Sequence, residues 1–170
     1  MKNLTFCPQC GASRLKFVED KKLVCSDCDF TLYHNVAGAV AVIIKHKEEI
    51  LFTRRNQNPQ KGKLDLAGGF TDADESAEQT CQREIQEELN FNIDLSQLKY
   101  IGSLPNIYRY KNIDYHTLDL FFEYELNEKP DFQLEKSELQ EVVWIPKSKL
   151  NIEDLAFESQ KKFFSKYGFI

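Results

Sequence analysis

Three carboxylates lie close together in this sequence of 170 residues: Glu84, Glu87 and Glu88. In a helix, at about 100° per residue, Glu84 and Glu88 fall within roughly 20° of Ala77, at the border of the core-facing stripe, and Glu87 lies about 80° away. Half-buried carboxylates about 6 Å apart repel by about 3 kcal/mol at an effective dielectric constant near 20. The arrangement therefore indicates a counter-cation, and oxygen ligands favour Mg²⁺ or Mn²⁺ over zinc. The alternative is a solvated acidic face on an ordinary amphipathic helix.

The helix that must carry these carboxylates has clear end signals. Ser76 followed by Gln79 has the spacing of a capping box, which predicts a first helical residue at Ala77. Asn90 tolerates the left-handed conformation that follows a helix end, which predicts Leu89 as the last helical residue. Apolar residues recur every four positions between these ends and predict the buried stripe: Ala77, Cys81, Ile85 and Leu89.

The helix and the loop before it resemble the Nudix box. The match comprises Gly69, five residues, Glu75, seven residues, and then Arg83-Glu84-Ile85-Gln86-Glu87-Glu88-Leu89. The family has glycine where this chain has Asn90, and asparagine can adopt the same backbone conformation. The resemblance implies an α/β fold, a Nudix-type α/β/α sandwich with a mixed central sheet.

The same resemblance implies a chemistry. The family hydrolyses a nucleoside diphosphate linked to another group, and Arg83 would pair with Glu75 to fix the loop. In-line attack of water on a diphosphate requires neutralised phosphate charge and a deprotonated water, which metals held by carboxylates provide. The resemblance also implies a set of ligands for catalytic Mg²⁺ or Mn²⁺: Glu84, Glu87, Glu88 and the Gly69 carbonyl.

Two Cys-x-x-Cys pairs precede this region, separated by fourteen residues: Cys7 with Cys10, and Cys25 with Cys28. This spacing is typical of a zinc ribbon, and a closed four-thiolate site would make the Zn²⁺ structural. Two disulfides are the alternative, which a reducing cytosol disfavours. We therefore expect a ribbon over residues 1–33 and a Nudix domain over 34–170. Ribbon-bearing Nudix proteins resemble NADH pyrophosphatases, whose Ser-Gln-Pro-Trp-Pro-Phe-Pro motif shares only Ser103 and Pro105 with this chain.

Four further residues are candidates for the site. Arg55 follows a predicted strand and is expected to contact phosphate through its planar guanidinium; the alternative is a solvated strand end. Tyr108 and Arg109 lie in a predicted loop over 105–112 and are expected to stack a base and touch phosphate; an ordinary hairpin rim is the alternative. Glu138 resembles the glutamate that many Nudix hydrolases place before a strand ending in Trp-Ile, which implies a metal ligand or general base.

The remaining elements follow from apolar patterning. A final helix is expected from Ile152, capped by Asn151, to Tyr167, where it would cover the sheet. The strands are expected at 36–44, 50–54, 64–70, 98–104, 115–126 and 142–146.

Composition limits the partners. A net charge of −5 gives no electrostatic footprint for nonspecific nucleic-acid binding. The first residues, MKNLTFC, lack the apolar region of a signal peptide, and the apolar run at 36–44 is too short to span a bilayer. We therefore expect a cytoplasmic protein that acts on a small nucleotide, binds no membrane and is a possible homodimer.

The most favoured function is Mg²⁺-dependent hydrolysis of the pyrophosphate bond in ADP-ribose or a related dinucleotide. One alternative is a Nudix-fold ligand sensor or nucleic-acid-binding regulator, with the ribbon as its reading head. The intact Arg83-Glu84 and Glu87-Glu88 pairs disfavour that reading, since a sensor does not need them. Another alternative keeps the chemistry and makes the substrate a capped RNA 5′ end, which would require a basic groove.

Overall fold

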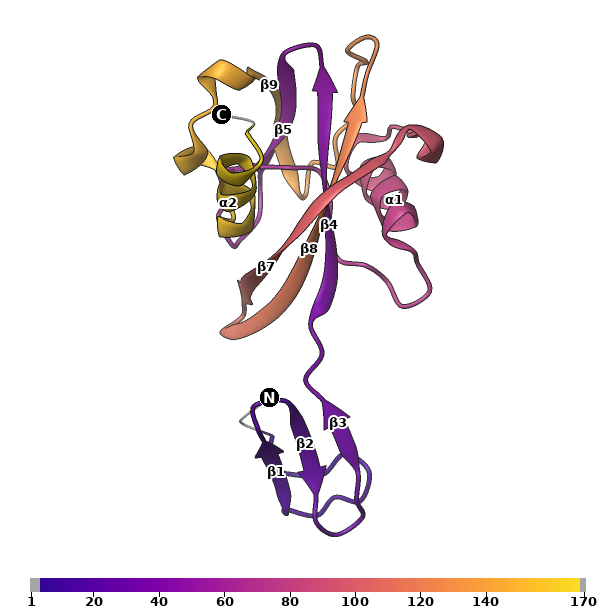
Figure 1. The fold of residues 1–170 in the computed structure, drawn as a ribbon, viewed down its shortest axis with the longest axis vertical. Coiled ribbons are helices and arrows are strands. Elements are labelled where there is room, and N and C mark those ends of the chain that lie inside the picture. Colours follow the sequence, from indigo (N-terminus) through magenta and orange to yellow (C-terminus); the bar gives the residue numbers. More distant parts are fainter. Residues whose placement is uncertain (1–3, 169–170) are drawn as a thin grey trace. The chain divides into compact units, whose positions relative to one another are not determined.

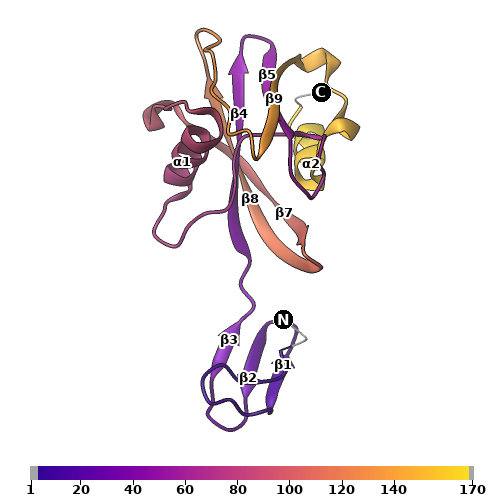
Figure 2. The same cartoon turned by 180° about the vertical axis from the view of Figure 1, so that it is seen from behind.

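The structure is a computed structural model, and it describes residues 4–168 of the 170-residue chain. The chain divides into two compact units, Met1–Val36 and Ala37–Ile170. Figures 1 and 2 show the two units from opposite sides. Residues 34–36 belong to the first unit, whereas the sequence placed them at the start of the second.

The first unit is a small antiparallel sheet with two cysteine-bearing turns. Its three strands are β1 (Leu15–Val18), β2 (Lys22–Cys25) and β3 (Thr31–Tyr33). Each Cys-x-x-Cys turn ends in a residue with positive φ, namely Gly11 at 75° and Asp29 at 58°. The amide of Gly11 donates to the Cys7 carbonyl (2.9 Å), which closes the first turn. Buried apolar side chains are few here, so the unit depends on something other than a core for its stability.

The second unit is built on a mixed six-stranded sheet in the order β6-β5-β4-β8-β7, with β9 paired to β5. Strands β4 and β8 run parallel, and the other pairs are antiparallel. The bounds of its strands are β4 Ala37–His46, β5 Glu49–Arg55, β6 Leu64–Asp65, β7 Lys99–Tyr110, β8 Ile113–Glu125 and β9 Leu139–Pro146.

Helices cover both faces of this sheet: α1 (Ala77–Leu89) lies on one face and α2 (Glu158–Lys166) on the other (Figures 1 and 2). Strand β4 alternates between two separate cores, because Val42 and Ile44 pack in the cluster with α1, whereas Ile43 packs in the cluster with α2. The predicted α/β/α sandwich with a mixed central sheet is confirmed. Short 3₁₀ helices are present at Leu95–Gln97, Lys147–Lys149 and Ile152–Asp154.

The predicted loop over 105–112 is wrong, because β7 and β8 form one long hairpin. Its turn lies at Lys111 and Asn112, which have positive φ values of 46° and 63°, as a two-residue hairpin turn requires. Pro105 pairs with Leu118 inside β7. A proline is tolerated there because β7 is the last strand of the sheet, so its missing N–H need not bond a further strand.

Two other expected elements are shorter than predicted. The strand expected over 64–70 keeps regular pairing only at Leu64–Asp65, and isolated bridges hold Ala67 and Phe70 against β4. The final helix begins at Glu158 and not at Ile152.

The shorter final helix has a physical cause. Asn151 accepts a hydrogen bond from the Glu153 amide (3.2 Å) and so caps only the 3₁₀ turn. The next residues are extended, because Leu155 forms a parallel bridge to Leu64 and the Ala156 amide donates to the Leu64 carbonyl (2.8 Å).

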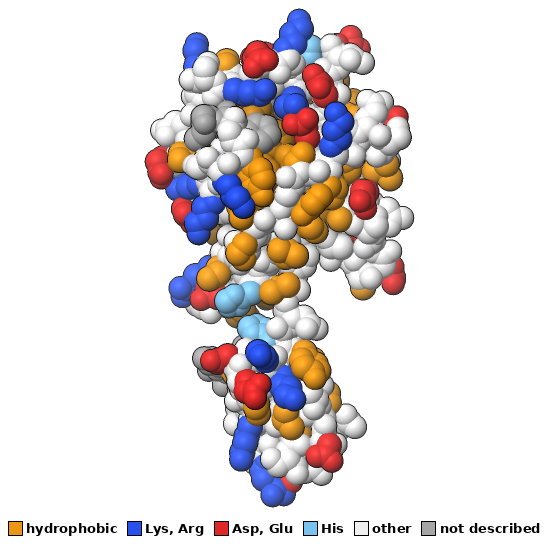
Figure 3. Space-filling model, viewed as in Figure 1, with side chains coloured by type: hydrophobic (Ala, Val, Ile, Leu, Met, Phe, Trp, Pro, Cys, Tyr) orange, Lys and Arg blue, Asp and Glu red, His pale blue; other side chains and the backbone are white. Residues whose placement is uncertain are grey.

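Apolar side chains are exposed along the β7–β8 hairpin, including Ile107, Ile113 and Tyr115. Figure 3 shows hydrophobic side chains across the visible face of the larger unit. Within residues 4–168, no helix is both long and apolar enough to cross a membrane.

Candidate active site

Helix α1 has the ends that the sequence predicts. The Gln79 amide donates to Ser76 Oγ (3.3 Å), and the Ser76 amide donates to Gln79 Oε1 (2.8 Å), so both halves of the capping box are present. Asn90 adopts the left-handed conformation at φ 50° and ψ 44°, and its amide donates to the Gln86 carbonyl. These caps set where the helix begins and ends, and the packing of Cys81, Ile85 and Leu89 in the core sets which way its carboxylates point.

The three glutamates differ in burial as the helical wheel predicts. Glu88 is 9% exposed and belongs to the buried side of α1. The Glu84 side chain is 14% exposed, whereas that of Glu87 is 59% exposed. Two carboxylates therefore stand at the edge of the core, and the third points toward solvent.

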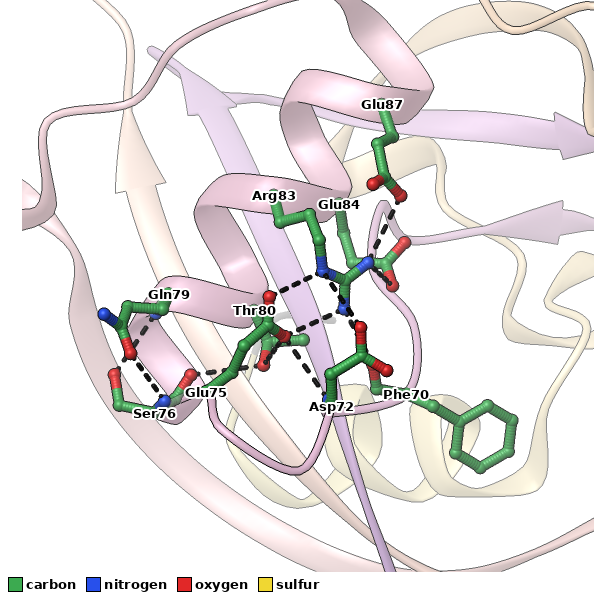
Figure 4. A network of polar contacts seen from close by, with 9 residues as sticks. All are labelled: Phe70, Asp72, Glu75, Ser76, Gln79, Thr80, Arg83, Glu84 and Glu87. Carbon is green, nitrogen blue, oxygen red and sulfur yellow. Dashed lines mark hydrogen bonds and ion pairs between the residues drawn. The ribbon is translucent and has the colours of Figure 1, made fainter.

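Arg83 holds the loop before the helix (Figure 4). Its Nε donates to Glu75 Oε1 (2.7 Å) and its Nη2 donates to Glu75 Oε2 (3.0 Å), which is a bidentate pair. Nη2 also donates to the Phe70 carbonyl (3.0 Å). The hydrogen bonds from Arg83 are the largest cause that lowers the pKa of Glu75 to about 2. Thr80, which the sequence did not single out, adds a hydrogen bond to Glu75 Oε2 (2.9 Å).

The other terminal nitrogen of Arg83 reaches the carboxylates of the helix. Nη1 donates to Glu84 Oε1 (2.8 Å) and to Glu87 Oε2 (3.2 Å). Arg83 therefore offsets part of the charge of both, although burial still raises the pKa of Glu84.

Glu88 lacks such a partner. Its Oε2 accepts a hydrogen bond from the Gly68 amide (3.3 Å), and within residues 4–168 no arginine, lysine or histidine forms an ion pair with it. Burial raises its pKa well above the ordinary value, and the charges of Asp65 and Glu84 raise it further. A buried acid that faces other acids is a site that a cation would stabilise.

The double glycine brings the backbone against these carboxylates. A Cβ at Gly69 would lie 2.4 Å from Glu84 Oε1, and a Cβ at Gly68 would lie 2.2 Å from the Val40 carbonyl oxygen. The Gly69 carbonyl accepts a hydrogen bond from the Val40 amide (2.8 Å) and keeps a second lone pair. The oxygen-rich donor set, the unpaired Glu88 and the close backbone approach fit a hard divalent cation.

A cavity of about 400 Å³ connects this acidic region with a second group of polar residues. On the acidic side, Glu135 and Glu138 line it together with the glutamates of α1. On the other side, Arg55 Nη1 donates to Asp65 Oδ2 (2.6 Å), and Gln160 Nε2 donates to Asp65 Oδ1 (2.6 Å). The cavity therefore joins residues from α1, the sheet and the start of α2.

Comparison with known proteins decides the family. The family profile described as NUDIX domain matches residues 34–167. The chain belongs to the Nudix family. The four-cysteine cluster before the Nudix domain is also the one that the resemblance to ribbon-bearing, NADH pyrophosphatase-like members predicted.

Individual proteins add to this assignment. The NAD-capped RNA hydrolase NudC of Haemophilus influenzae (strain PittGG) is 29% identical over 107 residues, which are 62% of this chain and 40% of that protein. The chain thus spans less than half the length of that curated relative. A NUDIX hydrolase from Nitrosomonas europaea superposes with a TM-score of 0.68 at 23% identity, covering 97% of this chain and 93% of that one.

A second solved structure has the same fold. The NUDIX domain of Shewanella oneidensis NrtR, solved in complex with ADP ribose, gives a TM-score of 0.62 at 19% identity, over 79% of this chain and 88% of that one. At these identities the two structures support the fold assignment.

The Nudix cavity contains most, but not all, of the residues that the sequence selected. Arg55 lines the cavity, whereas the preceding arginine, Arg54, pairs with Glu141 (2.6 Å). Tyr108 also lines it. Arg109 does not: it is 70% exposed and pairs with Asp114 across the hairpin (3.8 Å).

The expectation that Tyr108 and Arg109 act together is therefore corrected. Because both residues lie in a strand and not in a loop, consecutive side chains point to opposite faces of the sheet.

Sequence reasoning missed several residues of the Nudix cavity. The final helix was expected only to cover the sheet, yet Gln160 in the first turn of α2 contributes to the wall, and Asp119 of β8 is a buried part of it. The available signal was Thr117-Leu118-Asp119, polar residues at alternate positions of an otherwise apolar strand. The missed wall residues include Asp65, Asn106, Thr117, Asp119, Phe157 and Gln160.

The cysteines of the first unit form a second candidate metal site. The Sγ atoms of Cys7 and Cys28 lie 3.7 Å apart, as do those of Cys10 and Cys25. All four sulfur atoms lie within 4.8 Å of one another, and no other group of three or more His, Cys, Asp or Glu ligand atoms in residues 4–168 is as compact. All four are free thiols, so the alternative of two disulfides is not realised in this structure.

Proposed function

We propose that this Nudix chain hydrolyses the pyrophosphate bond of a nucleoside diphosphate linked to a second group, with ADP-ribose or a related dinucleotide as the substrate class. The observation that carries the proposal is the buried, unpaired carboxylate of Glu88 beside Glu84 and the Gly69 backbone in one cavity. Such a group is stable as an anion only when a cation accompanies it.

The proposed ligands of Mg²⁺ or Mn²⁺ are the carboxylates of Glu84, Glu87 and Glu88 and the Gly69 carbonyl. When bound, these ions would neutralise phosphate charge and lower the pKa of water. Arg83 Nη1 donates to both Glu84 and Glu87 and so ties these two carboxylates to the loop that Arg83 holds through Glu75. The Arg83–Glu75 pair positions the loop and does not touch the reacting atoms.

Two other side chains have proposed roles in the same reaction. Glu138 lines the acidic side of the cavity and is a candidate general base for the attacking water. Arg55 uses Nε for the Pro59 carbonyl (2.8 Å) and Nη1 for Asp65, which occupies two of its five N–H donors. Its remaining donors would contact a phosphate oxygen. Arg109, which points away, is not included.

Known proteins support the substrate class. The relative from Haemophilus influenzae is named for hydrolysis of NAD-capped RNA, and the NrtR domain was solved with ADP ribose. Both names describe a diphosphate that joins two ribosyl groups.

The experiment is a substrate screen with matched variants. ADP-ribose, NADH and diadenosine diphosphate are incubated with Mg²⁺ or Mn²⁺, and product nucleotides are separated by chromatography. Glu84→Gln should lower kcat/KM by at least about 100-fold, because a charged ligand becomes neutral. Glu78→Gln is the control, since this exposed acid of the same helix lies outside the cavity. No turnover of any compound, or equal turnover by Glu84→Gln, would refute the proposal.

A second candidate substrate is an RNA with a nucleotide cap, because the NudC relative carries that activity in its name. The chain's net charge of −5 disfavours extensive phosphate contacts. If the RNA body contributes, cleavage of capped RNA should fall steeply with salt while cleavage of the free dinucleotide does not. Equal salt dependence would assign the small nucleotide as the substrate.

A further proposal concerns the first unit, in which Cys7, Cys10, Cys25 and Cys28 would bind one structural Zn²⁺. The compact sulfur cluster supports it, because a closed set of four thiolates is typical of structural zinc. Measurement of zinc per chain by atomic emission tests it, with one ion expected.

A further inference from the structure

The cavity side opposite the carboxylates of α1 contains an unusual glutamine. Gln160 is 4% exposed, lines the cavity, and donates through Nε2 to Asp65 Oδ1 (2.6 Å). Its carbonyl oxygen, Oε1, is buried and has no hydrogen-bond partner among residues 4–168. An unpaired buried acceptor costs free energy that a ligand donor would recover.

The orientation of this amide is fixed by its neighbour. Asp65 receives Gln160 Nε2 on one oxygen and Arg55 Nη1 on the other (2.6 Å). Rotating the amide by 180° would put Oε1 against a carboxylate, where neither atom can donate. While Asp65 is ionised, Gln160 therefore keeps Oε1 as an unused acceptor and does not present its NH₂ group in that place.

Aromatic rings line the same cavity as Gln160. Tyr108 stands 5.5 Å from Phe70 in an edge-to-face arrangement and 5.7 Å from Phe157, measured between ring centroids. The Arg55 guanidinium lies over the Phe157 ring (5.0 Å). Because all these side chains line the cavity, its inner wall is suited to a flat ring.

A second amide repeats the arrangement. Asn106 Nδ2 donates to Asp119 Oδ2 (2.9 Å), and the same carboxylate accepts hydrogen bonds from Ser159 and Thr117 (2.6 Å each). This side of the cavity thus has two buried acids whose oxygens are already paired. The hydrogen-bond partners of Asp119 are all neutral, so a phosphate is disfavoured next to this acid, whereas a group with N–H donors is favoured.

We propose that this part of the cavity binds a flat heteroaromatic ring with an exocyclic NH₂ group, which donates a hydrogen bond to Gln160 Oε1. The inference rests on the proposed function, which puts the diphosphate at the glutamates of α1. Two rings have this chemistry: adenine, through its 6-amino group, and nicotinamide, through its carboxamide. Gln160 would then be the residue that rejects rings with a carbonyl or carboxylate at the same place.

The test compares nucleotide pairs that differ only in this group. Isothermal calorimetry with Mg²⁺ measures the Kd of AMP against IMP, and of nicotinamide mononucleotide against nicotinic acid mononucleotide. For the ring that the cavity takes, the amino-bearing nucleotide should bind the wild type about tenfold more tightly. A preference for AMP would identify adenine as the bound ring, and a preference for nicotinamide mononucleotide would identify nicotinamide.

Variants separate recognition from folding. Gln160→Met keeps the side-chain volume and should weaken the binding of the amino-bearing nucleotide alone. The Kd values of the two nucleotides of the pair should then differ by no more than about twofold. Asp65→Asn should also reduce the ratio of the two Kd values although Gln160 is still present. The reason is that the side-chain amide of Gln160 can then rotate by 180°. Gln97→Met is the matched control: this exposed glutamine also donates to a carboxylate, Asp94 (3.0 Å), but lies outside the cavity, and it should keep the full ratio.

The outcomes distinguish this inference from the proposed function. No preference in either arm for the wild type, or an unchanged ratio in Gln160→Met, would overturn the role of Gln160. An equal loss for both members of a pair would also overturn it, because this indicates a packing defect only. Absence of diphosphate hydrolysis would refute the proposed function while leaving these mononucleotide ratios measurable.

Discussion

The two candidate metal sites of this chain differ in how completely the protein assembles them. In the first unit, four cysteine sulfur atoms already lie within 4.8 Å of one another. In the Nudix domain, Arg83 pairs with Glu84 and Glu87, while Glu88 is left in the core with only the Gly68 amide. The cysteine ligands are already gathered together, whereas two of the proposed glutamate ligands pair with the guanidinium of Arg83.

This difference matches two uses of a metal. A small unit with few buried apolar side chains would depend on the proposed ion for its folding, which fits ligand atoms that already lie close together. The Nudix domain has two hydrophobic cores, so its folding need not depend on a metal, and the buried acid Glu88 is available for the metal-binding role proposed above. The following predictions test this contrast, beginning with the largest effect.

Removal of zinc should unfold the first unit and leave the Nudix domain folded. Zinc binding in small cysteine sites supplies on the order of 10 kcal/mol, and the unit has little else to hold it. With a strong chelator, four thiols should become reactive toward a thiol reagent. Burial raises the pKa of the fifth, Cys81, to about 12, so it should stay unreactive until the domain melts.

The check is thiol labelling followed by mass spectrometry, with amide hydrogen exchange of both units. Exposure of Cys81 at the same chelator concentration would show that the units unfold together, and the contrast would be lost.

Glu88→Gln should stabilise the metal-free protein and abolish its response to Mg²⁺. Burial raises the pKa of Glu88 in the folded protein. The free energy of unfolding is therefore highest at pH values below the pKa that Glu88 has in the unfolded chain, and it declines as pH rises through the pKa that Glu88 has in the folded protein. At pH 7 the neutral amide should therefore raise the free energy of unfolding by about 1–3 kcal/mol. Thermal melts with and without Mg²⁺ measure both effects. A lower free energy of unfolding in the variant would mean that Glu88 already has favourable partners in the metal-free protein. Glu78→Gln is the control for the loss of one negative charge from the helix.

Glu75→Gln should weaken the domain near neutral pH and matter less in acid. The hydrogen bonds from Arg83 lower the pKa of Glu75 to about 2 from an ordinary value of 4.5. Its stabilising effect is therefore complete above about 4.5 and lost as pH falls through about 2. Urea midpoints of wild type and variant should converge between pH 5 and pH 2. A constant gap across that range would contradict the assigned ion pair.

The smallest effect concerns the end of the helix that carries Glu87 and Glu88. Asn90 sits at φ 50°, where glycine has no steric cost. Asn90→Gly should change the free energy of unfolding by less than about 0.5 kcal/mol, whereas Asn90→Ala should lower it by about 1 kcal/mol. Equal values for the two variants, from urea denaturation, would show that the side-chain contacts of Asn90 with Gln86 and Gln133 matter more than its backbone.

The features that the sequence predicted correctly are local ones. The helix over 77–89 depends on caps within its own segment, and the cysteine turns depend on Gly11 and Asp29 beside them. The contact between Arg83 and Glu75 spans eight residues and came from the resemblance to the Nudix box. In each case the decisive partner lies nearby in the chain or in a fixed motif.

The features that were missed depend on strand pairing. Pro105 suggested a loop because a proline rarely fits a central strand, but only the sheet order shows that β7 is an edge. Asp65 and Gln160 lie 95 residues apart, and nothing in either segment predicts their contact. The contacts in this part of the cavity wall could therefore not be predicted from the sequence, whereas the acidic helix could.

The two cores of the Nudix domain share no buried residue, since one packs under α1 and the other under α2. Mutations around α2 can consequently alter the cavity wall at Gln160, where we propose that the ring binds, without disturbing helix α1, which carries Glu84, Glu87 and Glu88. Because the cores are separate, related proteins could evolve to bind different ligands through substitutions in one core while they keep the same reaction.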